Sequence, residues 1–151
     1  MSQVEEGSTF PDFSLSDQNG NVVTLADLKG KKAVIYFYPK DDTTGCTAEA
    51  CEFRDILSTF ANAQVFGVSP DDAKSHRKFV AKYELNFPLL VDEEHRFIES
   101  LGLWVEKSMY GKQYMGVERT TFVLDETGKV IRIFRKVKPQ GHAAEVAEVL
   151  K

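Results

Sequence analysis

Residues 33–38, Ala-Val-Ile-Tyr-Phe-Tyr, form a continuous apolar run that is rich in β-branched and aromatic side chains. A run of this length, closed by Pro39, is typical of a strand that lies inside a sheet and is buried on both faces. Such a strand needs other strands beside it and further elements above and below it. The rest of the chain must therefore supply a sheet and the helices that cover it.

The segments around this run supply both kinds of element. From Cys46 onward, apolar residues recur near helical spacing, at Ala50, Phe53, Ile56, Leu57 and Phe60. We expect the remaining elements as follows: an extended segment at 10–15 with a turn at 19–21, a strand at 22–24, a helical turn at 25–28, a strand at 64–68, a helix capped by Ser69 and running through Tyr83, a strand at 87–91, a helix at 94–101, a hairpin of 120–124 with 130–134, and a last helix after Gly141. This order predicts an α/β fold, a mixed β-sheet flanked by helices on both faces, in a single domain over residues 1–151.

Charge and motif content exclude several function classes. The net charge of −4 gives no reason to expect a nucleic acid or an anionic membrane as partner. Neither a basic-then-apolar leader nor a membrane-length apolar run is found, so we predict a cytoplasmic protein. His76, His95 and His142 are scattered without ligand spacing and are expected to be exposed helix residues. No glycine-rich phosphate motif is present, and we predict no cofactor and no metal.

Cys46 occupies the position with the clearest chemistry. A strand ends at Pro39, a polar loop follows, and Cys46 enters the first turn of a helix. The unpaired amides and the dipole of a helix N-terminus stabilise negative charge, which favours the reactive thiolate. The alternative is a small buried hydrophobe, the usual role of a free cysteine. Gly45 and the flanking Thr44 and Thr47 indicate partial exposure and favour the reactive interpretation.

Cys51 follows five residues later on the same expected helix. Five helical residues rise about 7.5 Å and turn about 140°, which puts the two Cα atoms roughly 8.7 Å apart. A disulfide needs about 4.4 to 6.8 Å. Either the cysteines never pair, or pairing requires the first helical turns to unwind. The spacing also differs from the C-x-x-C motif of disulfide oxidoreductases.

The residues around Cys46 resemble a known family. Pro39-x-x-x-Thr43-x-x-Cys46 is similar to the active-site signature of peroxiredoxins, and residues 36–55, YFYPKDDTTGCTAEACEFRD, resemble the bacterioferritin comigratory protein (BCP) or PrxQ subfamily. The resemblance runs from PDFSL near the start, through residues 109–122, MYGKQYMGVERTTF, to the last helix. Thr44 is a departure, because many relatives carry proline there. The resemblance implies a thioredoxin-like fold.

The same resemblance implies roles for five residues. Cys46 would be the peroxidatic cysteine, whose thiolate attacks a peroxide oxygen and becomes a sulfenic acid. Thr43 would offer its hydroxyl to the thiolate and the peroxide, although a cap or turn former is its ordinary role. Pro39 would limit water access besides ending the strand. Arg119 would be the fixed positive charge beside the sulfur. Cys51 would resolve the sulfenic acid as an intrachain disulfide.

The implied partners are hydroperoxide substrates, both hydrogen peroxide and organic hydroperoxides, and thioredoxin or a similar dithiol reductant. The subfamily also implies a monomer. A second hypothesis keeps the disulfide switch but makes the chain a peroxide sensor without catalytic turnover. Trp104 and the tyrosines near Met109 are expected to pack in the core or to line the pocket.

Overall fold

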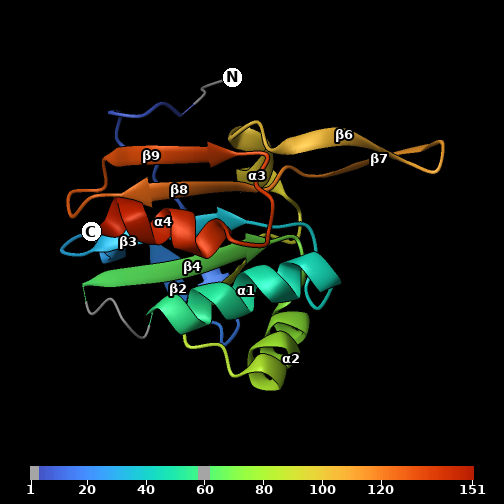
Figure 1. The fold of residues 1–151 in the computed structure, drawn as a ribbon, viewed down its shortest axis with the longest axis horizontal. Coiled ribbons are helices and arrows are strands. Elements are labelled where there is room, and N and C mark those ends of the chain that lie inside the picture. The colour runs from blue at the N-terminus through green and yellow to red at the C-terminus, as the bar shows by residue number, and fades with distance from the viewer. Residues whose placement is uncertain (1–3, 58–61) are drawn as a thin grey trace.

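A computed structural model describes residues 4–57 and 62–151 of the chain. The predicted Phe60 position of the first helix lies outside these residues. Figure 1 shows a central sheet with helices packed against it. The elements, in chain order, are β1 Ser14–Asp17, β2 Val22–Thr24, the 3₁₀ helix η1 Leu25–Leu28, β3 Lys32–Phe37, α1 Thr44–Leu57, β4 Ala63–Ser69, α2 Ala73–Tyr83, β5 Leu89–Val91, α3 Arg96–Ser100, β6 Trp104–Met109, β7 Lys112–Val117, β8 Thr120–Leu124, β9 Val130–Arg135 and α4 His142–Leu150.

The sheet is mixed, and β3 lies inside it as predicted. Its strand order is β2-β1-β5-β4-β3-β8-β9. β3 pairs in parallel with β4 and antiparallel with β8, while β4 pairs in parallel with β5. The β8–β9 hairpin confirms the prediction for residues 120–134. β3 has a neighbour on each side and an apolar layer on each face, so every residue from Ala33 to Tyr38 is buried, at 1% exposure or less.

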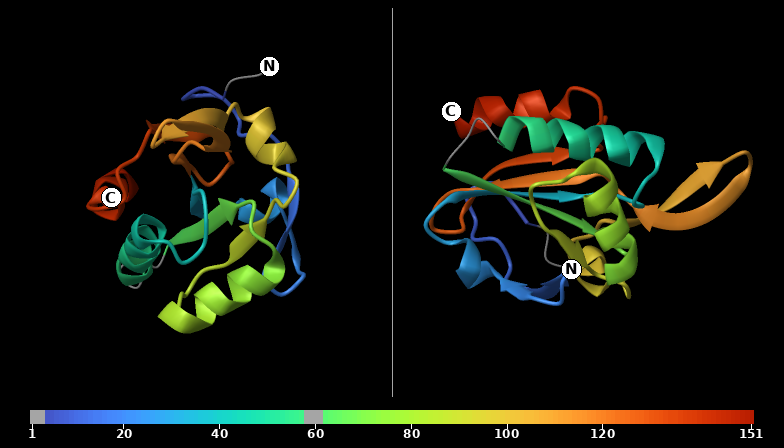
Figure 2. Two further views of the ribbon diagram at one scale, coloured as in Figure 1. Left: turned by 90° about the vertical axis from the view of Figure 1, so that its right-hand side faces the viewer. Right: turned by 90° about the horizontal axis from the view of Figure 1, so that it is seen from below.

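Two apolar layers cover the two faces of the sheet. On one face, Tyr36 and Tyr38 of the β3 segment pack with residues of α1, α2 and α4, including Phe53, Phe79 and Val146. Figure 2 shows α1 and α4 side by side over this face. The layer on the other face contains aromatic and aliphatic residues of the N-terminal segment, η1, β3, β8 and α3. The predicted fold class, with cover on both faces, is therefore confirmed.

A second hairpin, formed by β6 and β7, was not predicted. Its strands pair only with each other, and the hairpin extends away from the sheet (Figures 1 and 2). Tyr110 at its turn is 97% exposed, so the expectation that the tyrosines near Met109 pack in the core or line the pocket is wrong for this residue. Trp104 at its base is half-buried and stacks on His95, with ring centroids 3.8 Å apart.

Two further predictions need correction. Ser69 is the buried last residue of β4, and Asp72 caps α2 instead by accepting a hydrogen bond from the Ser75 amide at 2.8 Å. His76 and His142 are fully buried rather than exposed. Both imidazoles have polar partners inside the fold: His76 bonds Asp41 and the Leu90 carbonyl, and His142 bonds the Thr121 hydroxyl. A buried imidazole is tolerated where such partners satisfy its nitrogens.

Candidate active site

Cys46 lies in the first turn of α1, at the carboxyl end of β3. Thr47 donates its amide to the Thr43 carbonyl at 2.8 Å, which makes Thr43 the residue from which the helix begins. The amides of residues 44–46 come before Thr47 and have no acceptor within the helix. They therefore give the first turn, which contains Cys46, a partial positive charge. Cys46 is only 1% exposed, so the predicted partial exposure is wrong. The Cys46 side chain packs in the apolar layer beneath α1.

Arg119 reaches Cys46 from the other side of the site. It precedes β8, and its Nη2 donates to Cys46 Sγ at 2.9 Å. Its Nη1 donates to Glu49 Oε1, also at 2.9 Å. The side chains of Arg119 and Glu49 are 16% and 1% exposed, so this ion pair lies away from bulk water. One guanidinium thus connects a thiol and a carboxyl group that are three residues apart on one face of α1.

Glu49 is a buried residue of this site that the sequence reasoning missed. Burial raises its pKa from 4.5 to about 7, and the charge and hydrogen bond of Arg119 oppose the rise. Its second oxygen, Oε2, is buried and has no hydrogen-bond partner among the residues that the structure describes. A buried carboxyl with one unpaired oxygen favours the proton-bearing form. A signal existed in the sequence, because Glu49 falls on the apolar stripe of α1 with Cys46, Ala50 and Phe53.

Gly45 leaves the space that Arg119 occupies. A Cβ atom at this position would lie 3.1 Å from Arg119 Nη2 and 3.1 Å from Pro139 Cγ. Any side chain here would push against the guanidinium that contacts Cys46. Pro39 is half-buried just beyond the end of β3, at the start of the loop that leads to Cys46. The loop therefore positions the helix start, and Gly45 lets Arg119 approach it.

Thr43 takes part in a local turn. Its hydroxyl donates to the Lys40 carbonyl at 3.0 Å, the ordinary role of a threonine at this kind of position. A hydroxyl has a single proton to donate but two lone pairs that accept. In this arrangement the Thr43 hydroxyl can still accept a hydrogen bond, and it must turn before it can donate one to a bound molecule.

Two adjacent aspartates fix the loop between β3 and α1. Asp41 is buried and accepts hydrogen bonds from the hydroxyls of Tyr38 and Ser75, and its Oδ2 lies 2.6 Å from His76 Nδ1. Asp42 is exposed and binds Lys82 Nζ at 2.8 Å and the Tyr83 hydroxyl at 2.7 Å. Both aspartates thereby connect the loop to α2.

Asp41 and His76 also lie close to Asp71, in a group compact enough to hold a metal ion. The oxygens are already engaged, however. Asp71 Oδ2 accepts from the Ser69 hydroxyl and from the Asp41 amide at 2.7 and 2.8 Å. The network satisfies its own polar atoms, and we interpret it as a structural anchor for the loop.

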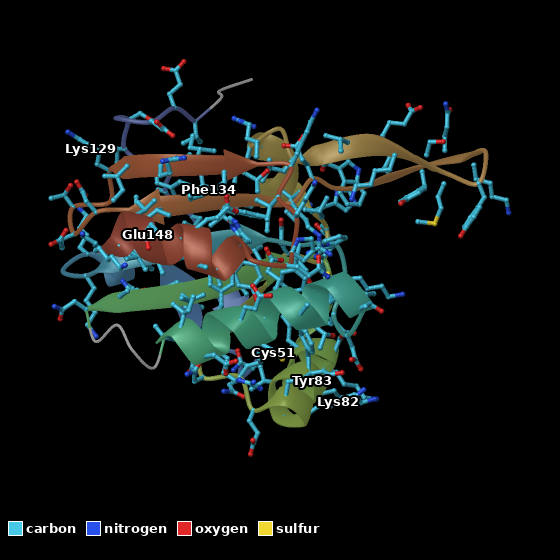
Figure 3. The ribbon with its side chains drawn as sticks, in the orientation of Figure 1. Cys51, Lys82, Tyr83, Lys129, Phe134 and Glu148 are labelled. Carbon is cyan, nitrogen blue, oxygen red and sulfur yellow. The ribbon has the colours of Figure 1, made fainter. Side chains whose placement is uncertain are left out.

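Cys51 lies on the same helix as Cys46 but on a different face. Both thiols are free, Cys46 buried and Cys51 half-buried. Figure 3 shows Cys51 between α1 and α2, near Tyr83. Since α1 is a continuous α-helix from Thr44 to Leu57, the two Cα atoms are roughly 8.7 Å apart by helix geometry, too far for a disulfide. A bond between the two requires the N-terminal turns of α1 to unwind.

No helix in residues 4–57 or 62–151 is long and apolar enough to cross a membrane.

The chain is similar to known proteins over nearly its whole length. The AhpC/TSA family matches residues 7–133. Peroxiredoxin Bcp from Bacillus subtilis is 49% identical over 150 residues, which cover 98% of this chain and 96% of the relative. Peroxiredoxin Bcp from Escherichia coli is 40% identical over 153 residues, covering 100% of this chain and 98% of the relative.

Solved structures agree with these relatives. A mutant of PrxQ from Xylella fastidiosa superposes with a TM-score of 0.91 at 36% identity, covering 99% of this chain and 97% of that one. The bacterioferritin comigratory protein of Xanthomonas campestris gives a TM-score of 0.85 at 44% identity, over 91% of this chain and 89% of that one. That structure was reported for the alkyl peroxide reduction activity of the Xanthomonas protein.

Proposed function

Because the chain belongs to the AhpC/TSA family and is a thiol peroxidase of the Bcp/PrxQ type, we propose that Cys46 is its peroxidatic cysteine, with Arg119, Thr43 and Pro39 completing the site. The contact of Arg119 Nη2 with Cys46 Sγ at 2.9 Å is the observation that carries this assignment. A guanidinium keeps its charge at any physiological pH, so it favours the thiolate, which is the attacking form. Glu49 holds the guanidinium in place through its other nitrogen.

In the proposed reaction the Cys46 thiolate attacks one oxygen of the hydroperoxide and breaks the O–O bond. The sulfur gives two electrons and becomes a sulfenic acid, while the other oxygen leaves as water or an alcohol. Negative charge moves from sulfur to the leaving oxygen, and Arg119 lies where it can stabilise both. The Thr43 hydroxyl would accept a hydrogen bond from the peroxide, and Pro39 would shield the sulfur from water. Hydrogen peroxide and organic hydroperoxides are the proposed substrates, the latter supported by the alkyl peroxide activity reported for the Xanthomonas relative.

Cys51 is the proposed resolving cysteine. After Cys46 is oxidised, the first turns of α1 unwind, the Cys51 thiol attacks the sulfenic acid, water leaves, and an intrachain disulfide forms. Thioredoxin or a similar dithiol then reduces this bond. The helical separation of the two cysteines supports a cycle with two conformations, folded for attack and unwound for the disulfide.

Three proteins test the assignment: wild type, Cys46→Ser and Cys51→Ser. Peroxide consumption with thioredoxin, thioredoxin reductase and NADPH should disappear in Cys46→Ser. In Cys51→Ser a sulfenic acid should accumulate, detected by dimedone labelling and mass spectrometry, and turnover should fall. Peroxide-treated wild type should show a Cys46–Cys51 link within one chain. Full activity in Cys46→Ser would refute the proposal.

The same assay separates an enzyme from a sensor. An enzyme consumes many equivalents of peroxide for each protein molecule, whereas a sensor without turnover consumes one.

We further propose that residues 1–151 act as one thioredoxin-like domain, as a monomer and in the cytoplasm. The family match over residues 7–133 and the 99% coverage by the Xylella structure support the single domain. Analytical ultracentrifugation tests the monomer, and cell fractionation tests the location.

A further inference from the structure

Lys107 is a half-buried lysine in the middle of β6, where it pairs with Tyr114 of β7. Its stem lies over Gly116 of the paired strand, where a Cβ atom would be 3.2 Å from Lys107 Cδ and 3.5 Å from Cε. Gly116 pairs with Val105, so it is nearer the base of the hairpin than Tyr114, the partner of Lys107. The lysine stem therefore runs along the hairpin toward its base, where the chain continues from Val117 to Arg119.

The charges of Cys46, Arg119 and Glu118 all act on the Lys107 ammonium group. Burial and the neighbouring Arg119 charge lower the pKa of Lys107, while Cys46 and Glu118 act in the opposite direction. In the described part of the chain, the Lys107 ammonium group has no hydrogen-bond or ion-pair partner. Glu118 is engaged elsewhere, by the Thr120 hydroxyl at 3.2 Å and by Arg135 at 3.9 Å.

A lysine that is half-buried beside a second cation, without an acidic partner, is unfavourable for folding alone. Groups of this kind are typical of sites where the partner arrives with the substrate. The reaction proposed for Cys46 supplies such a partner, because negative charge appears on the leaving oxygen when the O–O bond breaks.

We propose that Lys107 is a catalytic residue that donates a proton to the leaving oxygen of the hydroperoxide. The inference rests on the proposed role of Cys46. The thiolate sulfur bonds to the attacked oxygen, which keeps its hydrogen, and the O–O bond breaks. The leaving oxygen takes the electron pair of that bond together with a proton from the Lys107 ammonium, giving an alcohol or water. Neutral Lys107 then recovers a proton from solvent.

The neighbouring groups are less suited to this transfer. Arg119 cannot release a proton, and its Nη1 and Nη2 already bind Glu49 and Cys46. Glu49 can carry a proton near neutral pH, but its side chain is 1% exposed and bonded to Arg119, away from solvent. Lys107 is only half-buried, so solvent can return a proton to it after each reaction.

The test uses leaving groups of different basicity. Single-turnover oxidation of the reduced protein is followed by stopped flow with hydrogen peroxide, tert-butyl hydroperoxide and peracetic acid. The first two release strongly basic oxygens that need a proton, whereas peracetic acid releases acetate, which does not. For Lys107→Met we expect the rate constants with the first two to fall about 100-fold, the lower end of the range for general acid catalysis. The rate constant with peracetic acid should stay close to that of wild type.

Two further variants sharpen the result. Lys107→Arg keeps the positive charge but cannot donate the proton, so it should stay slow with hydrogen peroxide. Lys112→Met removes a lysine from the same hairpin, near its exposed turn, and should match wild type with all three peroxides. Full recovery in Lys107→Arg, or an equal loss with peracetic acid in Lys107→Met, would overturn proton donation. Failure of the Cys46 assignment is seen separately, as peroxide reduction that survives in Cys46→Ser.

Discussion

Replacement of Glu49 by glutamine should change how the stability of the protein depends on pH. Burial raises the pKa of Glu49 from 4.5 to about 7, so the folded protein holds a proton that the unfolded chain releases. A group with a raised pKa contributes its full stability below the unfolded value, and this contribution is lost as pH rises through the folded value. The interval from 4.5 to about 7, at about 1.4 kcal/mol per pH unit, corresponds to about 3 kcal/mol.

Urea denaturation of the reduced protein between pH 4 and pH 8.5 (about the range in which this proton is exchanged) measures the effect. The unfolding free energy of wild type minus that of Glu49→Gln should decrease by about 3 kcal/mol as pH rises over this range. Glu52→Gln removes a carboxylate from the same helix and serves as the matched control, for which we expect a much smaller shift. A wild-type-minus-Glu49→Gln difference that stays constant with pH would mean that Arg119 keeps Glu49 ionised throughout, and the reasoning from burial would fail.

Three further substitutions test packing and burial at Gly45, Gly67 and His142. Gly45→Ala should slow oxidation of Cys46 about tenfold or more in stopped flow, with the melting temperature unchanged or higher, because alanine favours the helix but its Cβ meets Arg119 at 3.1 Å. Gly67→Ala should cost about 1–3 kcal/mol in urea denaturation, since its Cβ would lie 2.8 Å from Leu89. Burial lowers the pKa of His142, so the stability that this residue contributes should be lost as pH drops below 6.5, and the unfolding free energy of wild type minus that of His142→Gln should decrease there in urea denaturation.

The sequence predicted the elements whose signals are local. The apolar run at 33–38 became β3, the spacing after Cys46 became α1, and the turn residues at 125–129 joined β8 to β9. Each of these segments carries its own periodicity or turn chemistry, so no knowledge of distant residues was needed. The same holds for the last helix, which begins directly after Gly141.

The sequence did not predict the β6–β7 hairpin because the outer half of the hairpin is exposed on both faces. Residues 112–115 are all exposed, so there is no alternation of buried and exposed positions to reveal a strand. Pairing between the two strands, rather than burial, holds the hairpin together. For the same reason, the position of the Lys107 side chain depends on Gly116, nine positions later on the antiparallel partner strand.

The errors at the site all concern burial of polar groups. His76, Glu49 and Cys46 are all buried, and each has a polar partner that is distant in the sequence and that no local pattern identifies. Asp41, the partner of His76, is 35 positions away in the sequence. Arg119 is 70 positions from Glu49 and 73 positions from Cys46. The resemblance to peroxiredoxins located Arg119, but the identity of its second partner required coordinates.

The loop before α1 is held at two adjacent residues of unequal strength, and this determines how far the helix can unwind. Asp41 is buried in a network with Tyr38 and His76, whereas Asp42 forms exposed contacts with Lys82 and Tyr83. Removing one partner from a buried charged network costs several kcal/mol, while an exposed pair contributes about 0–1 kcal/mol. If the proposed Cys46–Cys51 disulfide forms, we expect the Asp42 contacts to break first and the Asp41 anchor to hold. Rearrangement would then be confined to the segment between these aspartates and the turn that carries Cys51, and the sheet that positions Arg119 would stay folded for the next cycle.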